Sequence, residues 1–428
     1  MALDSLKNAW NVADLRKKIG YTLLMFLIFR IGAHIPSPFV DRELLNELFG
    51  SGAMMTFMNT LSGGSFKSLS VFALSITPYI TASIIFQLLT VVVPQLERLS
   101  KEGDYGRKKI TQYTRYATVG LGFVQAIGLT FGIRSALIIP SPEMRWPIII
   151  MVALVLTAGT AFLMWLGEAI TEKGIGNGIS LIIFAGIVSQ IPSAISSLFS
   201  MLRVGEIGGF SIIGLLLIVT FITAGVIYVH EGQRRVIVQY AKRVVGRRVY
   251  GGQSSHIPLK VNQAGVIPVI FAISLVALPQ TISSYMPTSG FSQFVSVWFS
   301  MNGSLTSIPY LLFYGALIIF FTYFYTSITF NTNDVAENLK KYGGFIPGLR
   351  PGRPTAEYLT KVLNRITLAG GLFLALIAVL PTLVIGLTGI TNIYFGGTSL
   401  LIVVGVALDT MKQIESQLMS RHYQGFMK

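Results

Sequence analysis

The sequence contains no cysteine, and charged residues make up only 12% of its 428 residues. Without cysteine, the chain can form neither disulfides nor thiolate-ligated metal sites. So few charges, beside 52% hydrophobic residues, exclude an ordinary soluble domain. Two long stretches, residues 261–333 and 366–408, contain no charged residue at all. The chain is therefore predicted to lie in a membrane, where the backbone must satisfy its own hydrogen bonds.

Ionisable residues are also scarce inside the apolar stretches. Ion-coupled pumps carry protons or cations on intramembrane Asp, Glu or His, and these stretches hold almost none. No P-loop, HExxH or GxSxG motif occurs, which argues against nucleotide hydrolysis and intramembrane proteolysis. We therefore expect no catalytic residue, no metal and no cofactor. Arg30 is the exception, and either backbone carbonyls hold its charge or its side chain reaches outward to the interface.

The apolar stretches predict an all-α polytopic membrane protein with about ten spanning helices. A span needs about 20 apolar residues, so each charge-free stretch reads as two spans joined by an uncharged turn. The predicted spans are residues 19–38, 70–93, 114–135, 147–167, 177–199, 210–229, 264–285, 308–328, 367–387 and 391–409.

The distribution of Lys and Arg predicts the orientation in the membrane. With ten spans, 27 of these residues lie on the side of both termini and only five on the other side. Positive residues mark the cytoplasmic side, so both termini are expected there. The five residues on the opposite side are Arg42, Lys67, Arg134, Arg145 and Arg203.

Two cytoplasmic loops, residues 230–262 and 331–365, are longer than neighbouring helices require. The first opens with alternating Val236, Val238 and Tyr240 and predicts a β-hairpin. The second is rich in Gly and Pro and predicts a turn-rich protrusion, followed by a helix from about Thr355. Both could simply be solvated basic loops. Their length and their interleaved Tyr, Phe and Ile favour docking of a partner.

The chain divides into two halves of about five spans each. The fifth span opens with GIGNGISLIIF and the tenth with YFGGTSLLIVV, so each places glycines before an Ile/Leu run. Duplicated halves with an odd number of spans are inverted relative to each other, as in many transport proteins.

Between the first two spans, residues 55–67 are moderately apolar but too short to cross. They are either an outside loop or a re-entrant segment.

Isoleucine dominates the spans. Ile80 and Ile84 are four residues apart, as are Ile179 and Ile183, so each pair shares a helix face. Most isoleucines are expected to face lipid. A pore lined by isoleucines would exclude ions by dewetting and would suit a cargo of any sequence.

Five long segments closely resemble the SecY family of bacterial protein-conducting channels, and the resemblance covers essentially the whole chain. They are Phe72–Glu97, Gly174–Ile187, Tyr240–Ala272, Gly343–Leu359 and Tyr394–Val404. The resemblance implies a clamshell of two inverted five-helix halves around an hourglass pore. Carried onto matching positions, the apolar pore ring is Ile80, Ile84, Ile179, Ile183, Ile270 and Ile402.

The resemblance also implies a plug, a lateral gate and docking sites. The plug is Met55, Thr56, Phe57, Met58, Asn59, Thr60, Leu61, Ser62, Gly63, Gly64, Ser65, Phe66 and Lys67. Opening would part spans 2 and 3 from spans 7 and 8, where we assign the polar gate residues Ser83, Gln87, Gln125 and Ser274. These four could equally be ordinary polar groups of helix packing. The docking residues are Arg243, Arg247, Arg248, Arg350 and Arg353.

The resemblance implies partners as well: SecE and SecG subunits, the motor ATPase SecA, the translating ribosome, signal sequences, nascent polypeptides and membrane lipid. Phosphates of ribosomal RNA would suit the basic loop tip. The expected location is the cytoplasmic membrane of a bacterium.

The predicted organisation has five parts. Residues 1–18 form an amphipathic cytoplasmic segment, for which a disordered leader is the alternative. Residues 19–199 form the N-terminal half, 200–209 the hinge loop, 210–409 the C-terminal half and 410–428 a cytoplasmic tail.

Two other functions remain open from the residues alone. A small-solute secondary transporter shares inverted halves and glycine breaks, but needs a polar substrate site near the midplane. An RNA-binding or ribosome-binding membrane anchor without a pore is compatible with the formal net charge of +15. Deletion of residues 55–67 would create an ion leak in a channel and none in an anchor.

Overall fold

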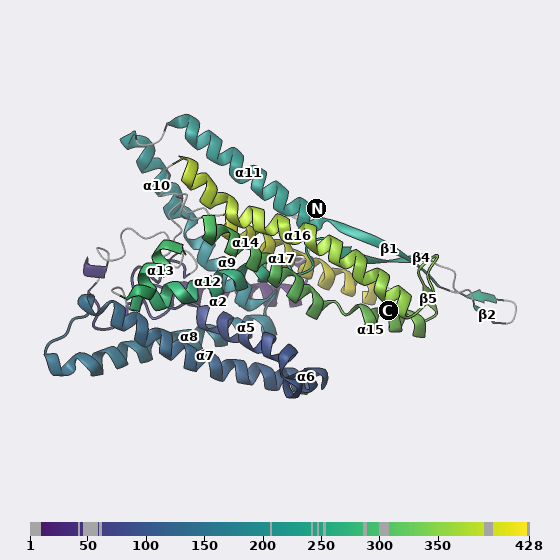
Figure 1. The fold of residues 1–428 in the computed structure, drawn as a ribbon, viewed down its shortest axis with the longest axis horizontal. Helices are drawn as coiled ribbons and strands as arrows, with labels where there is room; N and C mark the ends of the chain where they lie inside the picture. The colour runs from purple at the N-terminus through teal and green to yellow at the C-terminus, as the bar shows by residue number, and fades with distance from the viewer. Residues whose placement is uncertain are drawn as a thin grey trace.

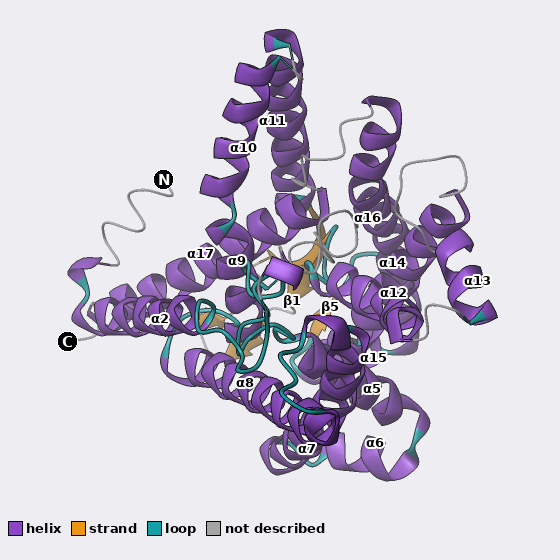
Figure 2. Cartoon of the chain, turned by 90° about the vertical axis from the view of Figure 1, so that its left-hand side faces the viewer, coloured by secondary structure: helices purple, strands orange, loops and turns teal. Residues whose placement is uncertain are grey.

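The computed structural model describes residues 10–41, 43–45, 59, 62–205, 208–240, 243–245, 248–250, 254–285, 289–298, 308–388 and 397–425. Within these residues, long helices form a body from which a few strands project at one end (Figure 1). In both views α7 and α8 lie along one edge of this body and α11 along the opposite edge (Figure 2).

The N-terminal half contains seven of the described α-helices, formed mostly by the apolar runs. They are α2 (Ala13–Gly32), α5 (Thr77–Val92), α6 (Pro94–Lys101), α7 (Asp104–Gly132), α8 (Arg145–Lys173), α9 (Gly178–Ser189) and α10 (Ile191–Val204). Short 3-10 turns, η1 (Arg134–Ala136) and η2 (Pro142–Met144), connect α7 to α8.

The C-terminal half contains the remaining described helices and all five strands. The helices are α11 (Gly209–Glu231), α12 (Ile267–Tyr285), α13 (Gly290–Trp298), α14 (Ile308–Thr329), α15 (Thr332–Lys341), α16 (Arg353–Thr388) and α17 (Gly397–Gly425). The strands are β1 (Gln233–Tyr240), β2 (Arg243–Val245), β3 (Arg248–Tyr250), β4 (Ser254–Lys260) and β5 (Gly344–Phe345).

A new helix starts at a proline directly after one predicted span and within another. α5 and α6 meet at Pro94 with a bend of 99°, because proline lacks the amide hydrogen that continues a helix. The predicted span 177–199 is two helices that meet at Gln190, and Pro192 lies in the first turn of α10. The predicted span 70–93 becomes helical only at Thr77, with Pro78 in its first turn.

Other boundaries also differ from the sequence predictions. The helix at the first predicted span is Ala13–Gly32 rather than 19–38. The predicted hinge loop 200–209 is shorter, because α10 continues to Val204 and α11 begins at Gly209. The predicted tail is helical to Gly425 as part of α17. Most of the predicted amphipathic N-terminal segment lies outside the described residues.

Length and composition identify four described helices that could cross a membrane, or five if the bent α5–α6 pair counts as one. Shorter apolar helices occur at Leu216–Glu231 and Ile267–Pro279. The number of ten spans and the inverted relation of the halves therefore stay predictions.

The two long loops that were predicted to be cytoplasmic form one small sheet with the strand order β4-β1-β5. β1 pairs antiparallel with β4 from Gln233–Lys260 to Gln239–Ser254, which confirms the predicted hairpin. Pairing of Gln239 with Phe345 adds the second loop to the sheet, which the sequence did not predict. α16 begins at Arg353, close to the helix start predicted at Thr355, and runs without a break into the ninth predicted span.

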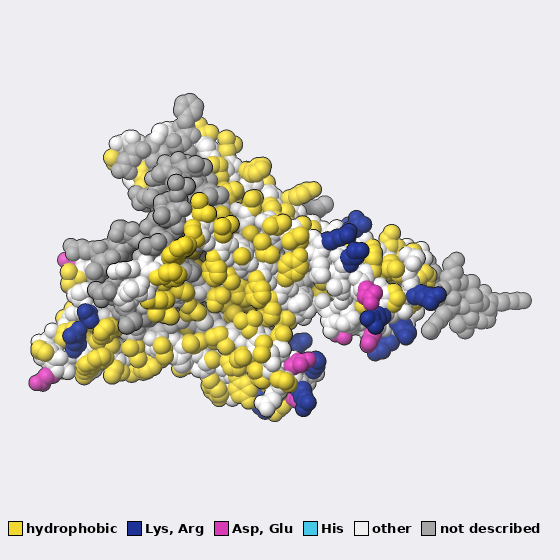
Figure 3. All heavy atoms as spheres, in the orientation of Figure 1, with side chains coloured by type: hydrophobic (Ala, Val, Ile, Leu, Met, Phe, Trp, Pro, Cys, Tyr) yellow, Lys and Arg dark blue, Asp and Glu magenta, His cyan; other side chains and the backbone are white. Residues whose placement is uncertain are grey.

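Apolar side chains fill the sheet's inner face and cover the surface of the helical body. Val238, Leu259 and Leu359 are at most 1% exposed, and each such burial from water contributes about 1.5–3 kcal/mol. Figure 3 shows hydrophobic side chains over most of the helical body, with Lys and Arg gathered where the strands project. This distribution fits a membrane-embedded body with one strongly basic end.

Candidate functional site

A cavity of about 640 Å³ opens between α5, α7, α8, α9, α12 and α14. Its polar lining contains opposite charges, amides and hydroxyls, and its inner end is apolar. Its lining residues are Tyr79, Ile80, Ser83, Gln87, Lys108, Thr111, Arg115, Glu168, Thr171, Glu172, Asn177, Ile179, Ser180, Ile183, Ile267, Ile270, Phe271 and Tyr325.

A second, much smaller cavity of about 20 Å³ shares part of this lining. That volume is about what one water molecule occupies. It is lined by Ser75, Ile76, Thr77, Ile80, Ile183, Ile270, Ile273, Ser274, Ala277 and Ile402. Ile80, Ile183 and Ile270 line both cavities. These three side chains therefore form an apolar constriction, which we call the waist.

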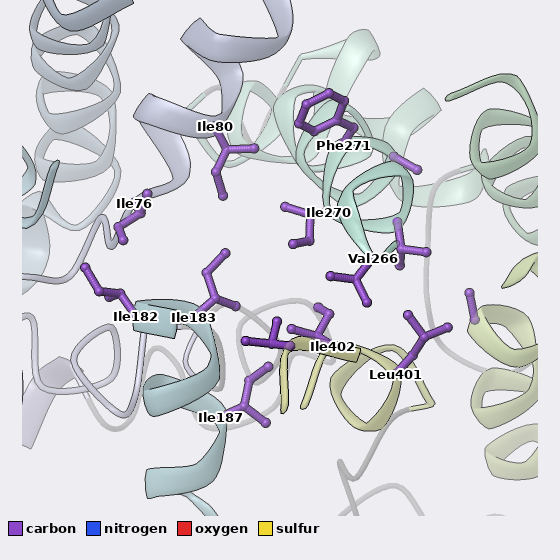
Figure 4. Close-up of a cluster of buried hydrophobic side chains, with 14 of the residues drawn as sticks. Ile76, Ile80, Ile182, Ile183, Ile187, Val266, Ile270, Phe271, Leu401 and Ile402 are labelled. Atoms are coloured by element: carbon purple, nitrogen blue, oxygen red, sulfur yellow. The ribbon is translucent and has the colours of Figure 1, made fainter. Parts of the chain in front are cut away.

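Figure 4 shows Ile80, Ile183, Ile270 and Ile402 converging on one space from α5, α9, α12 and α17. Their exposed fractions are between 1% and 8%. Ile179 lines only the larger cavity. Ile84 is buried in the same hydrophobic cluster but lines neither of these two cavities. The structure thus brings four of the six predicted ring residues together.

Five residues of the small cavity were missed by the sequence analysis: Ser75, Ile76, Thr77, Ile273 and Ala277. Ile76 lies four residues before Ile80, although it precedes α5, and Ile273 and Ala277 lie three and seven residues after Ile270 on α12. Helical spacing from the predicted ring could have found the two α12 residues.

α9 is positioned by its N-terminus and by close contact with α8. The Asn177 side chain accepts hydrogen bonds from the backbone amides of Ile179 and Ser180, at 3.1 and 3.3 Å. This cap satisfies two amides that the helix leaves unpaired. A Cβ atom at Gly178 would lie 1.9 Å from the carbonyl oxygen of Gly167 on α8, so only glycine fits there. Both features set where Ile179 and Ile183 lie.

The segment predicted as a plug is described at Asn59 and from Ser62 to Lys67. Its other residues, Met55, Thr56, Phe57, Met58, Thr60 and Leu61, lie outside the described residues. The Asn59 side chain accepts a hydrogen bond from the Lys67 amide at 2.9 Å. Phe66 is 6% exposed and packs in a cluster with α7 and α8 side chains. The described part of this segment lines neither cavity.

Arg30 lies in the last turn of α2 and donates through Nη1 to the Gly63 carbonyl at 2.7 Å. A backbone carbonyl therefore holds its charge, as one of the two sequence interpretations expected. The same nitrogen lies 3.3 Å from the Ser189 hydroxyl at the end of α9.

Helix α12 packs against both α5 and α7, which is the interface where the gate residues were predicted. Ser83 and Gln87 line the larger cavity, and Gln87 Nε2 donates to the Ser83 hydroxyl at 3.4 Å. The Gln87 Oε1 atom is buried and has no hydrogen-bond partner among the described residues. Ser274 lines the small cavity and donates to the Ile270 carbonyl within its own helix. Gln125 lies on α7 and lines neither cavity.

An ion pair in the wall of the larger cavity was missed by the sequence analysis. Arg115 contacts both carboxylate oxygens of Glu168, at 2.8 Å each, and so joins α7 to α8. The sequence could have indicated this pair, because Arg115 lies at the start of one predicted span and Glu168 directly after the end of the next. Opposite charges are therefore expected on the same side of the two neighbouring helices.

The predicted docking arginines lie in the projecting loops. Arg350 is exposed in the turn before α16, and its carbonyl accepts a hydrogen bond from the Thr355 hydroxyl at 2.9 Å. Arg353 pairs with Glu357 at 3.1 Å on the exposed first turn of α16. Arg243 and Arg248 lie in the β2–β3 hairpin, and Arg247 lies outside the described residues.

A polytopic helix bundle in which a polar cavity ends at an isoleucine constriction has the architecture of a closed membrane channel. A family model described as SecY matches residues 70–411. The chain is 49% identical to the protein translocase subunit SecY of Halalkalibacterium halodurans over 99% of both chains. It is 47% identical to the same subunit of Streptomyces coelicolor over the whole of both. The chain belongs to the SecY family.

Solved structures with the same fold are more distant in sequence. A structure described as a protein-conducting channel matches 94% of this chain and 92% of its own, with a TM-score of 0.66 and 18% identity. Sec61 in the canine ribosome–channel complex from the endoplasmic reticulum matches with a TM-score of 0.63, 18% identity and the same coverage. The fold is therefore that of the SecY and Sec61 channels.

Proposed function

We propose that this chain is the central pore-forming subunit of a Sec translocon. It moves unfolded secretory polypeptides across the cytoplasmic membrane of a bacterium and releases transmembrane segments sideways into lipid. The waist is the observation that carries this proposal, because Ile80, Ile183 and Ile270 line both the larger and the smaller cavity. An apolar constriction blocks hydrated ions yet offers no selective contact to a passing chain.

In this proposal, opening separates α5 and α7 from α12 and α14. The six predicted ring isoleucines surround the passing chain, and the Met55–Lys67 segment acts as the plug. Ser83, Gln87, Gln125 and Ser274 tune how readily the two halves part. A hydrophobic signal sequence enters the parted interface because it exchanges water for lipid and apolar side chains.

The energy for transport comes from partners, and the chain itself acts as a passive channel. The curated relatives are named translocase subunits, and the canine Sec61 neighbour was solved on a ribosome. We infer that the basic loops bind the translating ribosome or the motor ATPase SecA, and that SecE and SecG accompany the chain. Both termini lie in the cytoplasm.

Site-specific crosslinking of a stalled secretory chain tests the proposal. One cysteine is placed in the cargo and one at Ile270 in the waist, since the native chain has no competing thiol. The control cysteine replaces Leu312 on α14, whose side chain is 71% exposed. We expect crosslinks at position 270 and none at 312. Absence of the crosslink at 270 with an engaged cargo would reject a pore through the waist.

A further inference from the structure

Arg30 is a half-buried cation at the end of α2 that lines neither of the two cavities. Its Nη1 atom donates to the Gly63 carbonyl at 2.7 Å and lies 3.3 Å from the Ser189 hydroxyl. One guanidinium nitrogen therefore joins three segments that are distant in sequence: the end of α2, residues 62–69 and the end of α9. Hydrogen bonds from a charged donor are stronger than neutral ones, more so where water is excluded.

The contact continues into the helix that carries part of the waist. The Ser189 hydroxyl donates to the Gly186 carbonyl at 2.7 Å, within the last turn of α9. Ile183 and Ile187 are 4% and 2% exposed on the same helix and belong to the cluster around the waist. Arg30 therefore links Gly63 to α9, about two turns from Ile183.

The backbone at Gly63 and Gly64 fits closely into this junction. Both residues have positive φ, 67° and 93°, which side chains rarely adopt. A Cβ atom at Gly63 would lie 3.2 Å from both the Gly186 Cα and the Ser189 hydroxyl, and one at Gly64 would lie 2.7 Å from the side-chain Nε2 atom of Gln190. The glycine pair thus presents the Gly63 carbonyl to Arg30 while its backbone packs directly on α9.

We propose that Arg30 is a positioning residue that fastens residues 62–67, the described end of the predicted plug, to α9 and thereby keeps the channel closed at rest. This inference rests on the proposed function, in which that segment is the plug. Moving the segment leaves the guanidinium without its carbonyl partner in a region where unpaired charges are costly. Release therefore occurs only when an engaged signal sequence compensates for the lost contact.

The test compares four single variants of the complete complex in planar bilayers and proteoliposomes. Arg30→Gln removes the charge, Arg30→Lys keeps it, and Ser189→Ala removes the contact on α9. The matched control is Arg134→Gln, which removes an exposed arginine whose contact is the ring of Phe131 on the preceding helix. The measurements are ion conductance without cargo, export of a normal precursor, and export of a precursor with a weakened signal sequence.

We expect Arg30→Gln to raise the resting conductance roughly tenfold, the scale set by losing one charged hydrogen bond. It should also increase export of the weakened precursor while export of the normal one is retained. Ser189→Ala should raise the resting conductance by less than Arg30→Gln does. Arg30→Lys keeps the charge and should therefore conduct only slightly more than the wild type. Arg134→Gln should resemble the wild type.

A merely structural role for Arg30 predicts a different result, in which export of both precursors falls and the weakened one gains nothing. That result, or an unchanged resting conductance in Arg30→Gln, would overturn the proposal. Failure of the channel function itself is distinguishable, because then the wild-type complex would export neither precursor.

Discussion

At the residue scale, the side chain of Asn177 has a larger role than its position before α9 suggests. It caps α9 and also lines the larger cavity, so it links helix stability to the position of Ile179 and Ile183. Asn177→Ala should destabilise the folded chain by about 1 kcal/mol and raise the resting ion conductance. Thermal unfolding in detergent and bilayer recordings measure the two effects.

The matched control for this prediction is Asn331, which caps α15 in the same way with bonds to Asn333 and Asp334. Asn331→Ala should cost similar stability without any change in conductance, because α15 contributes no residue to either cavity. Equal conductance in both variants would show that the cap of α9 does not set the waist.

The ring isoleucines show what residue spacing can and cannot predict. Ile80 and Ile84 share a helix face, yet only Ile80 lines the cavities. One helical turn advances about 5.4 Å along the axis, which is enough to move a side chain past a narrow constriction. Spacing therefore predicts which face meets the pore, whereas depth along the axis depends on how the helices are tilted and packed.

At the element scale, the turn of residues 346–352 presents Arg350 at the end of the shared loop sheet. Strand β5 ties this turn to β1, and Ile346 is buried against the sheet's core. Binding of a partner at Arg350 would therefore act directly on α16, which begins at the end of this turn and includes the ninth predicted span. Arg350→Glu should lower export at least about tenfold, the factor that corresponds to ~1.4 kcal/mol of binding free energy.

Export assays with purified inverted vesicles measure this effect, and immunoblotting of the membranes verifies that the variant inserts normally. Lys361→Glu makes the same charge change on the exposed surface of α16 and is the control. If the two variants reduce export equally, general charge rather than the loop tip accounts for docking.

The pairing of β1 with β5 could not be read from the sequence, although the hairpin of β1 and β4 could. Alternation of side chains is a local signal, and it predicts a strand without naming its partner. Gln239 and Phe345 are more than 100 residues apart, and β5 has only two residues. The break at Gln190 was missed for another reason: apolar residues continue on both sides of it while the chain starts a new helix.

At the scale of the whole molecule, composition determined most of what could be predicted. Low charge and long apolar runs predicted a helical membrane protein, and the asymmetry of Lys and Arg predicted its orientation. The waist could not follow from composition, because Ile80, Ile183 and Ile270 come from three helices that are far apart in the chain. Only the resemblance to a family connected them before the fold was known.

Packing of α12 on α5 and α7 joins the two halves of the molecule in the closed state. We expect Gln87 to weaken this interface, because its Oε1 atom is buried without a partner among the described residues. Removing such an unsatisfied acceptor stabilises the closed arrangement by about 1–3 kcal/mol. Gln87→Leu should therefore make the channel more stringent, so that precursors with weak signal sequences are exported less while strong ones are little affected.

The control for Gln87→Leu is Thr81→Val, a change of nearly equal volume on the same helix at a buried hydroxyl that donates to the Thr77 carbonyl. It should leave the ratio of weak to strong export unchanged. Ser274→Ala should also have a small effect, because that hydroxyl is satisfied by the Ile270 carbonyl within α12. An unchanged ratio in Gln87→Leu would mean that its amide does not tune the parting of the two halves.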